Sequence, residues 1–321
     1  MPIRDQQDAI YSMKQPLTVI VPCKNEQLNI RACIESFYSI ADEILIADSG
    51  STDATLEIVR QFENVRVIER EYRTSGDFKN WAIPQSTNDW VLIVDADERI
   101  KPDLADEIVM CHSRGPEFDG YWIYRENHFL GHRQNYGDAR TDRVLRLFHR
   151  DRERYFGPSD HGEVTIDTGN VGKLECKMEH YSAWSYDQLY GKNDRYTKLQ
   201  AQQWAEKGKD ATYFKLLVGP LWRFFREYIL QRSILDGKVG LQTAWIAAFY
   251  SFNKQARLWA INHALEQQDI DAVVFREMEA ELHGESVEDS EESEAIEQAE
   301  EFAVEPADNK VDIVESQRRA A

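Results

Sequence analysis

Residues 90–98 read WVLIV-DADE, an apolar run followed at once by three carboxylates. A continuous apolar run between polar residues is typical of a strand that is buried on both faces of a sheet. Ligands of open α/β sheets bind outside the carboxyl ends of strands, so we expect Asp95, Asp97 and Glu98 to face a binding site. The alternative is an acidic strand end that only caps a helix near Pro102, because a D-x-D pattern is short.

Strand and helix signals alternate upstream of this stretch. Apolar runs predict strands, and apolar residues at helical spacing predict the helices between them. The expected strands are residues 17–21, 43–47 and 65–68, with helices at 26–40, 52–62 and after residue 75. This alternation predicts an α/β fold whose mostly parallel, Rossmann-like sheet carries helices on both faces.

The second half of the chain changes character. Residues 119–182 contain short strand candidates separated by Gly, Pro and Asp, and residues 186–265 return to a helical pattern. We therefore expect four parts. They are an N-terminal extension over residues 1–15, an α/β domain over 16–182, a C-terminal helical subdomain over 183–283 and a disordered acidic tail over 284–321.

The net charge of −19 is concentrated near the C-terminal end of the sequence. From Glu266 onward there are 19 acidic and 4 basic residues, which leaves 34 basic and 38 acidic residues in positions 1–265. The acidic tail cannot bury enough apolar surface to offset its chain entropy, so we expect it to be disordered. The nearly neutral body lacks the basic excess of nucleic-acid-binding proteins, so we expect no nucleic-acid partner.

The four cysteines show no CxxC spacing. With no signal-peptide pattern at the N-terminus, they are expected to be reduced thiols in a cytoplasmic protein. No apolar run approaches the roughly 18 residues of a membrane span, so we expect a protein that does not cross a bilayer.

Polar turn residues also follow the first two predicted strands. The first strand ends in VPCKNE, residues 21–26, and the second ends in DSGSTD, residues 48–53. Neighbouring strand ends form one crevice, where the carboxylates of Glu26 and Asp48 can accept hydrogen bonds from a nucleoside. The alternative is that the polar residues of these loops only cap helices. Their coincidence with the acids at residues 95–98 favours a binding site.

The segments VPCKNE, ADSGSTDAT and VDADE, in this order and spacing, resemble the family 2 glycosyltransferases of GT-A fold. The pattern is most similar to bacterial lipopolysaccharide core glycosyltransferases of the WaaE/KdtX type, over about residues 16–265. The resemblance implies an inverting, metal-dependent enzyme that moves a hexose, expected to be glucose, from a UDP-sugar. The implied acceptor is a saccharide or lipid-linked saccharide of the lipopolysaccharide core, another cell-surface glycolipid or a polysaccharide.

The resemblance also assigns roles to particular residues. The implied nucleotide-binding residues are Pro22, Glu26, Asp48, Lys79 and Asp95, and the implied ligands of Mn²⁺ or Mg²⁺ are Asp97, Asp95 and His180. A cation held in this way stabilises the charge of a departing diphosphate. Alternatives stay open, because Lys79 can equally be a solvated lysine and a lone histidine is more often structural.

Inversion requires a carboxylate that takes the proton of the acceptor hydroxyl. The best candidate segment is DHGE, residues 160–163. It departs from the adjacent His-Glu pair of the related enzymes, because Gly162 separates the two residues. We favour Glu163 as the general base over Asp160, and a strand-edge Glu163 with no catalytic part is the third alternative.

Residues 213–265 combine many aromatic residues with an excess of basic ones. Helices of this kind either lie in a membrane interface or bury their rings within a packed subdomain. The resemblance to enzymes that act on lipid-linked sugars favours peripheral contact with the cytoplasmic face of the inner membrane.

Two other functions stay open at this point. A nucleotidyltransferase also uses a carboxylate-bound metal on a parallel sheet, although VPCKNE lacks the Gly-rich and basic character of its usual loop. A non-catalytic sugar-nucleotide-binding protein is the second alternative. A dinucleotide-dependent dehydrogenase is disfavoured because no GxGxxG follows the first strand.

Overall fold

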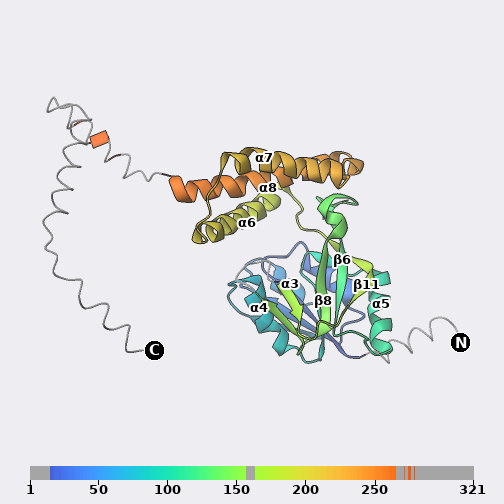
Figure 1. The fold of residues 1–321 in the computed structure, drawn as a ribbon. Helices are drawn as coiled ribbons and strands as arrows, with labels where there is room; N and C mark the ends of the chain where they lie inside the picture. The colour runs from blue at the N-terminus through green and yellow to red at the C-terminus, as the bar shows by residue number, and fades with distance from the viewer. Residues whose placement is uncertain (1–14, 157–162, 265–270, 272–273, 276–277, 279–321) are drawn as a thin grey trace, which may run out of the picture. The chain divides into compact units, whose positions relative to one another are not determined.

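The computed structural model describes residues 15–156, 163–264, 271, 274–275 and 278. The chain divides by its internal contacts into residues 1–258 and residues 259–321. The sheet and the candidate site belong to the first unit (Figure 1). The expected acidic tail and Asp160 lie outside the described residues, as does the expected N-terminal extension apart from Gln15.

Strands and helices alternate through the first third of the chain and then give way to longer strands. The strands are β1 (Leu17–Cys23), β2 (Glu43–Asp48), β3 (Val65–Glu69), β4 (Trp90–Ile93), β5 (Glu98–Arg99), β6 (Gly120–Phe129), β7 (His132–Arg133), β8 (Arg143–His149), β9 (Glu153–Phe156), β10 (Glu163–Ile166) and β11 (Val171–His180). The helices are α2 (Ile30–Phe37), α3 (Thr55–Val59), α4 (Ser75–Ala82), α5 (Pro102–Ser113), α6 (Tyr186–Glu206), α7 (Tyr213–Phe225) and α8 (Lys238–His263), with short turns η1 (Ile83–Gln85), η2 (Gly137–Thr141), η3 (Arg226–Leu230) and η4 (Ser233–Asp236).

The main sheet has the order β3-β2-β1-β4-β8-β6-β11-β5, and β7 pairs with β6 at its side. Strand β1 runs parallel to both β2 and β4, with Val19 opposite Ile44 and Leu92. Strand β8 is antiparallel to β4 and β6, while β6 and β11 are parallel. The expected parallel sheet is therefore confirmed from β3 to β4, and the second half of the sheet is mixed.

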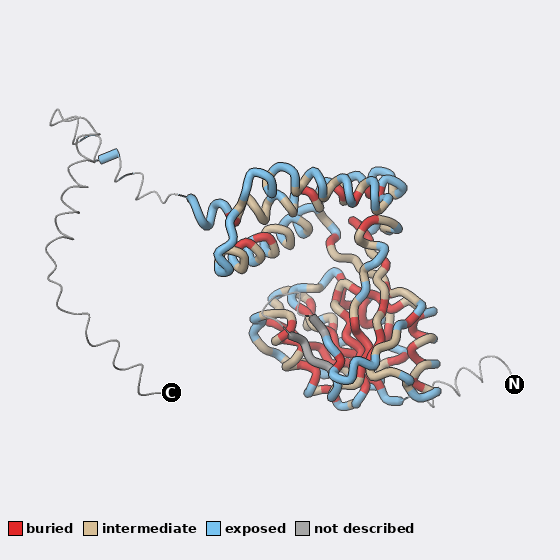
Figure 2. Tube along the Cα trace, viewed as in Figure 1, coloured by how far each residue is buried: buried red, intermediate tan, exposed pale blue. Residues whose placement is uncertain are grey.

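Alternate residues of the central strands pack against helices on opposite faces of the sheet. Val19 belongs to the core that contains α2 and α5, and Ile20 belongs to the core that contains α4. Both side chains are fully buried, and Figure 2 shows many buried residues in the α/β part of the molecule. This arrangement confirms the predicted strand buried on both faces, because helices cover each side.

The first two helices are shorter than their apolar spacing predicts. Helix α2 buries Ile30, Cys33, Ile34 and Phe37, the i, i+3, i+4, i+7 stripe of an amphipathic helix. Its expected start at residue 26 is wrong by four residues. Polar side chains in the preceding loops bond to nearby backbone groups instead, which competes with helix formation. The same effect confines α3 to Thr55–Val59.

Helices α6, α7 and α8 follow the last strand. No residue of α7 is buried, and Tyr213, Phe214 and Leu217 are 94%, 70% and 68% exposed. Helix α7 leads directly into the π-helical turn η3. Among the described helices, none is both long enough and apolar enough to cross a membrane.

Candidate active site

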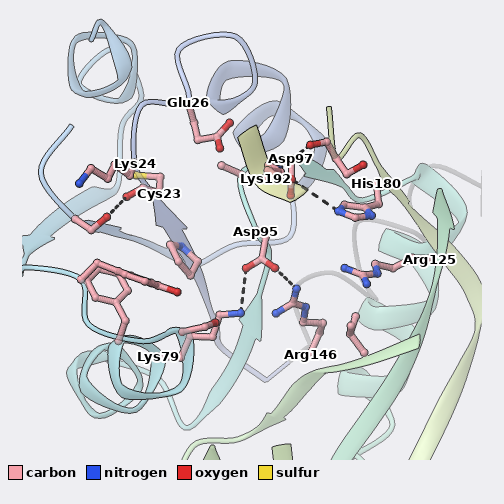
Figure 3. Close-up of a pocket in the computed structure, with 18 of the residues that line it drawn as sticks. Cys23, Lys24, Glu26, Lys79, Asp95, Asp97, Arg125, Arg146, His180 and Lys192 are labelled. Carbon is pink, nitrogen blue, oxygen red and sulfur yellow. Dashed lines mark hydrogen bonds and ion pairs between the residues drawn. The ribbon is translucent and has the colours of Figure 1, made fainter. Parts of the chain in front are cut away.

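The carboxyl ends of β1 and β4 open into a cavity of about 1180 Å³ (Figure 3). Six residues that the sequence analysis singled out line it: Pro22, Glu26, Lys79, Asp95, Asp97 and His180. They come from loops, strands and helix α4 and are up to 158 positions apart in the chain, and the parallel pairing of β1 with β4 places the residues that follow these two strands side by side. Asp95 and Asp97 face the cavity as expected, whereas Glu98 is fully buried and is not among the described residues that line it.

Asp95 is held by two cations. Its carboxylate pairs with Lys79, at 3.2 Å between Oδ1 and Nζ, and its other oxygen pairs with Arg146. Burial alone raises the pKa of this carboxyl, but the charges of Arg146 and Lys79 outweigh burial and hold the pKa far below its ordinary value. Burial likewise lowers the pKa of Lys79, against the opposing effect of Asp95. Asp95 therefore stays ionised and fixed in direction.

A β-bulge in β8 turns Arg146 toward Asp95. Leu147 lies opposite Tyr121 and Leu145 lies opposite the next residue, Trp122, so Arg146 is an extra residue in the ladder. Leu145 and Leu147 accordingly pack in the cores on opposite faces of the sheet, although they are only two positions apart. Bulges commonly re-aim a side chain next to an active site, and this one directs a 4% exposed arginine into the cavity.

Glu98 ties the acidic turn to the far strand. Its carboxylate accepts a hydrogen bond from the backbone N–H of Asp95 at 2.9 Å and pairs with Arg146 at 3.0 Å. In β5, Glu98 lies opposite His180 of β11. Tyr181 also donates its backbone N–H to the carbonyl oxygen of Asp97 at 2.8 Å. These bonds place His180 beside the turn at residues 95–98, although it is 82 positions from Glu98 in the sequence.

Asp97 faces a neutral imidazole. Its Oδ2 lies 3.7 Å from Nε2 of His180 and 3.2 Å from Nζ of Lys192. Burial, despite the opposing charge of Asp97, lowers the pKa of His180, so the ring is uncharged at pH 7. Figure 3 shows the three side chains converging from different elements.

The neighbours of His180 fix which of its nitrogens carries the proton. Asn127 donates from Nδ2 to the carboxylate of Asp142 at 2.8 Å, so its Oδ1 is the atom that faces Nδ1 of His180, at 2.6 Å. Nδ1 must therefore donate, and Nε2 presents a lone pair toward Asp97. A carboxylate oxygen and a neutral imidazole nitrogen that face each other are a donor set that suits a divalent cation such as Mn²⁺.

The loops after β1 and β2 bind each other. Ser51 accepts a hydrogen bond from the backbone N–H of Asn25 at 2.9 Å, and Asn25 accepts one from the N–H of Thr52 at 2.8 Å. Asp48 is 1% exposed, and its Oδ2 accepts bonds from the N–H groups of Gly50 and Ser51, each at 2.8 Å. Asp48 shapes its own turn and is not among the residues that line the cavity. Glu26 does line it, and burial raises the pKa of its carboxyl.

The segment expected to supply a general base is only partly described. Asp160 lies outside the described residues, and Glu163 begins β10, where it pairs with Phe156 of β9. Thr165, two residues further along β10, lines the cavity. The chain near Glu163 therefore passes beside the site.

Comparison with known proteins agrees with this geometry. The model of the glycosyl transferase family 2 matches residues 18–168. The lipopolysaccharide core biosynthesis glycosyltransferase LpsC of Rhizobium meliloti is 30% identical over 258 residues, which cover 79% of this chain and 95% of that protein. The chain belongs to the family 2 glycosyltransferases. This membership makes it an enzyme and decides against the nucleotidyltransferase and the non-catalytic binding protein.

Two further similarities accompany this assignment. An uncharacterized glycosyltransferase of Rickettsia felis is 29% identical and covers 76% of this chain and 89% of its own length. Glucosyl-3-phosphoglycerate synthase from Mycobacterium tuberculosis, solved with Mn²⁺ and UDP-glucose, is 15% identical with a TM-score of 0.42, over 65% of this chain and 84% of that chain. The sheet order and the helices on both faces of the sheet give this glycosyltransferase its GT-A-like architecture.

Sequence reasoning singled out Lys79 but gave no role to Arg125, Arg143 or Arg146, which also line the glycosyltransferase site. Arg125 pairs with Glu98 at 3.4 Å and with Asp142 at 2.9 Å, and nothing in its local sequence distinguishes it from a solvated strand residue. Arg146 differs from Arg125 in its local sequence. The available signal was an arginine between two leucines in an otherwise apolar strand, which predicts either a bulge or a buried ion pair.

Replacing Asp95 by asparagine should leave Lys79 and Arg146 without their counter-charge. We expect Asp95→Asn to lower the free energy of unfolding at pH 7 by about 3 kcal/mol, the usual cost of breaking a buried pair. Because the folded pKa of Asp95 is depressed, its contribution to stability is complete above the unfolded pKa of about 4 and is lost as the pH falls below it. The difference between the two proteins should therefore be constant from about pH 5 to 8 and shrink by about 1.4 kcal/mol per unit below pH 4.

Urea unfolding across this pH range measures both quantities. Asp103→Asn is the control, because Asp103 is an exposed carboxylate 3.9 Å from Lys101 and its loss should have little effect. A difference between wild type and Asp95→Asn that persisted unchanged to pH 3 would show that the two cations do not depress the pKa of Asp95.

Proposed function

We propose that this glycosyltransferase is an inverting, metal-dependent enzyme that transfers a hexose, glucose in the first instance, from a UDP-sugar to a saccharide of the lipopolysaccharide core or a related surface polysaccharide. The observation that carries this proposal is the Asp97–His180 pair, two acceptor atoms 3.7 Å apart at the sheet edge. The role of LpsC in lipopolysaccharide core biosynthesis supports the acceptor class.

The residues present fit a divalent cation at this position. Asp97 and His180 would hold Mn²⁺ or Mg²⁺, which when bound supplies positive charge to the leaving diphosphate. Lys79 and Arg146 occupy part of the lone-pair capacity of the Asp95 carboxylate. Its remaining lone pairs would bind the cation or accept a hydrogen bond from the ribose. Lys192 pairs with Asp97 at 3.2 Å in this structure. With a nucleotide bound, its ammonium group would pair with the diphosphate instead of with Asp97.

The nucleoside would lie toward β1 and β2, where β1 and its following loop supply Pro22 and Glu26 and the residue after β2 is Ser49. Because Asp48 is buried in its own turn, its part would be to shape the loop and not to contact the nucleotide. The hydrogen bonds between the two loops keep both in place before a ligand binds, which lowers the entropy lost on binding.

Glu163 is the general base that we propose for inversion, with Asp160 as the second choice. The base must take the proton from the acceptor hydroxyl as that oxygen attacks the sugar. The position of Thr165 on the cavity wall supports a location for this base on the segment before β10.

Removal of Asp97 tests the cation site. We expect Asp97→Ala to lose metal-dependent UDP binding and to reduce kcat by roughly 100- to 1000-fold, because the charge on the leaving group is no longer stabilised. Titration calorimetry with UDP and Mn²⁺ and a glycosyl-transfer assay measure the two effects. Asp89→Ala is the matched control, since Asp89 precedes the same strand at its other end and is 65% exposed. Retained turnover in Asp97→Ala would rule out the metal role.

Substitution of the two candidate bases separates binding from chemistry. Glu163→Gln should bind UDP with Mn²⁺ as the wild type does and reduce transfer by roughly 100- to 10,000-fold, because only proton removal is lost. Asp160→Asn should retain activity. An active Glu163→Gln with an inactive Asp160→Asn would move the base to Asp160, and two active variants would place it elsewhere.

We also propose that α7 touches the cytoplasmic face of the inner membrane. Leu221, Trp222 and Phe225 are 57%, 55% and 44% exposed, which leaves an apolar surface that the described residues do not cover. Arg223 and Arg226 on the same helical segment both pair with Asp138, so the exposed apolar side chains carry this proposal. The exposure of these rings favours the membrane-interfacial alternative over a subdomain that buries them.

Loss of two rings should weaken this contact. The double variant Trp222→Ala, Phe225→Ala is expected to bind vesicles containing anionic phospholipid at least about tenfold more weakly, because each ring removes buried apolar area. Vesicle co-sedimentation measures binding, and circular dichroism checks folding. The control is Leu28→Ala, Tyr38→Ala, which removes exposed apolar residues from the α/β part. Unchanged partitioning of the α7 variant would exclude this surface.

A further inference from the structure

An arginine and a tryptophan form a preassembled pair on the cavity wall. The guanidinium carbon of Arg143 lies 4.8 Å from the ring centroid of Trp122, and both residues line the cavity. Trp122 on β6 lies opposite Leu145 of β8, so Arg143 is its diagonal neighbour across the two strands. Stacking on an indole ring restricts a guanidinium to few orientations, so little rotamer entropy is left to lose when it binds a ligand.

The pair lies on the side of the acids away from the nucleotide loops. The sheet order β2-β1-β4-β8-β6 puts the proposed nucleotide site at β1 and β2, the acids after β4, and Arg143 and Trp122 beyond them on β8 and β6. A cavity of about 1180 Å³ exceeds the usual range for one small ligand, roughly 300–1,000 Å³. The β8–β6 side therefore has room for the second substrate of a transferase.

The charge of Arg143 is not neutralised within the described structure. Most of the other cations that line the cavity have carboxylate partners: Lys79 and Arg146 face Asp95, Arg125 faces Asp142, and Lys192 faces Asp97. Among the side chains that the structure describes in residues 15–152 and 165–264, no carboxylate lies within 4.0 Å of Arg143, and its side chain is exposed. An exposed guanidinium whose central carbon lies over an aromatic ring can still donate its N–H groups to an incoming oxyanion.

We propose that the acceptor is an anionic saccharide, one that bears a carboxylate or a phosphate, and that Arg143 binds this group beside Trp122. The proposal rests on the glycosyltransferase function proposed above and names its acceptor class. A guanidinium binds carboxylate and phosphate through two parallel hydrogen bonds, which also fixes the direction of the sugar. Arg143 is thus a specificity-determining residue for the acceptor and has no part in donor binding.

The test compares matched sugars on the full-length protein loaded with UDP and Mn²⁺. The probes are methyl glucoside, glucose 6-phosphate and glucuronate, so the neutral sugar is matched by one phosphate and one carboxylate. Their dissociation constants are measured by saturation-transfer NMR for the wild type and for Arg143→Ala, Arg143→Lys and Arg152→Ala. Arg152 is the control because it is an exposed arginine just beyond the other end of β8.

We expect the wild type to prefer at least one anionic sugar over the neutral one, and Arg143→Ala to weaken that sugar by roughly 10- to 100-fold, as for a charge-assisted pair. Binding of the neutral sugar and of UDP should not change, Arg152→Ala should behave as wild type, and Arg143→Lys should recover part of the loss. Whichever anionic sugar is lost identifies a phosphate or a carboxylate as the recognised group.

Several outcomes would overturn the proposal. No preference for either anion, an equal loss of neutral and anionic sugars in Arg143→Ala, or a tenfold weaker UDP affinity in that variant would each do so, the last by assigning Arg143 to the donor. Failure of the wild type to bind UDP with Mn²⁺ is a different result, because it contradicts the proposed function itself. Circular dichroism melting of each variant separates these results from misfolding.

Discussion

The pairing of carboxylates with cations at the sheet edge is the constraint on which the rest of this site depends. Asp95 and Glu98 lie in a turn that the sheet partly removes from water, and such charges persist only with close counter-charges. Arg146 supplies a counter-charge to both of them at once. With the turn fixed in this way, Glu98 can pair with β11, and that pairing delivers His180 to Asp97.

The parallel and the antiparallel strands contribute different kinds of group to the cavity. The parallel strands present loops that are already hydrogen-bonded to each other, and the antiparallel strands present side chains from their middles. Backbone groups of loops can bind a ligand that many enzymes share, such as a nucleotide. Side chains on strands can be substituted individually, which allows a binding site to differ between enzymes. In this glycosyltransferase the two halves meet at Asp95 and Asp97, where bond breaking is proposed to occur.

Sequence patterns predicted the parallel half of the sheet well because each of its strands is a short apolar run that ends in polar turn residues. The same patterns overestimated α2 and α3, since the side chains of Asn25 and Ser51 bond to loop backbone instead of extending a helix. Six of the nine site residues chosen from the sequence line the cavity. Asp48 was predicted to bind the nucleotide because it is charged. Its carboxylate instead accepts hydrogen bonds from the backbone of its own turn.

Because Arg146 is an extra residue in β8, its removal would change the charge of the site without changing the pairing of the strand. Leu145 and Leu147 point to opposite faces of the sheet, as two consecutive residues of a regular strand do. A chain shortened by Arg146 alone would thus regain a regular ladder with its apolar residues correctly placed, while Asp95 would lose a counter-ion. One additional residue in β8 thus supplies a counter-ion to Asp95 and Glu98 while the apolar residues on either side of it stay in their cores.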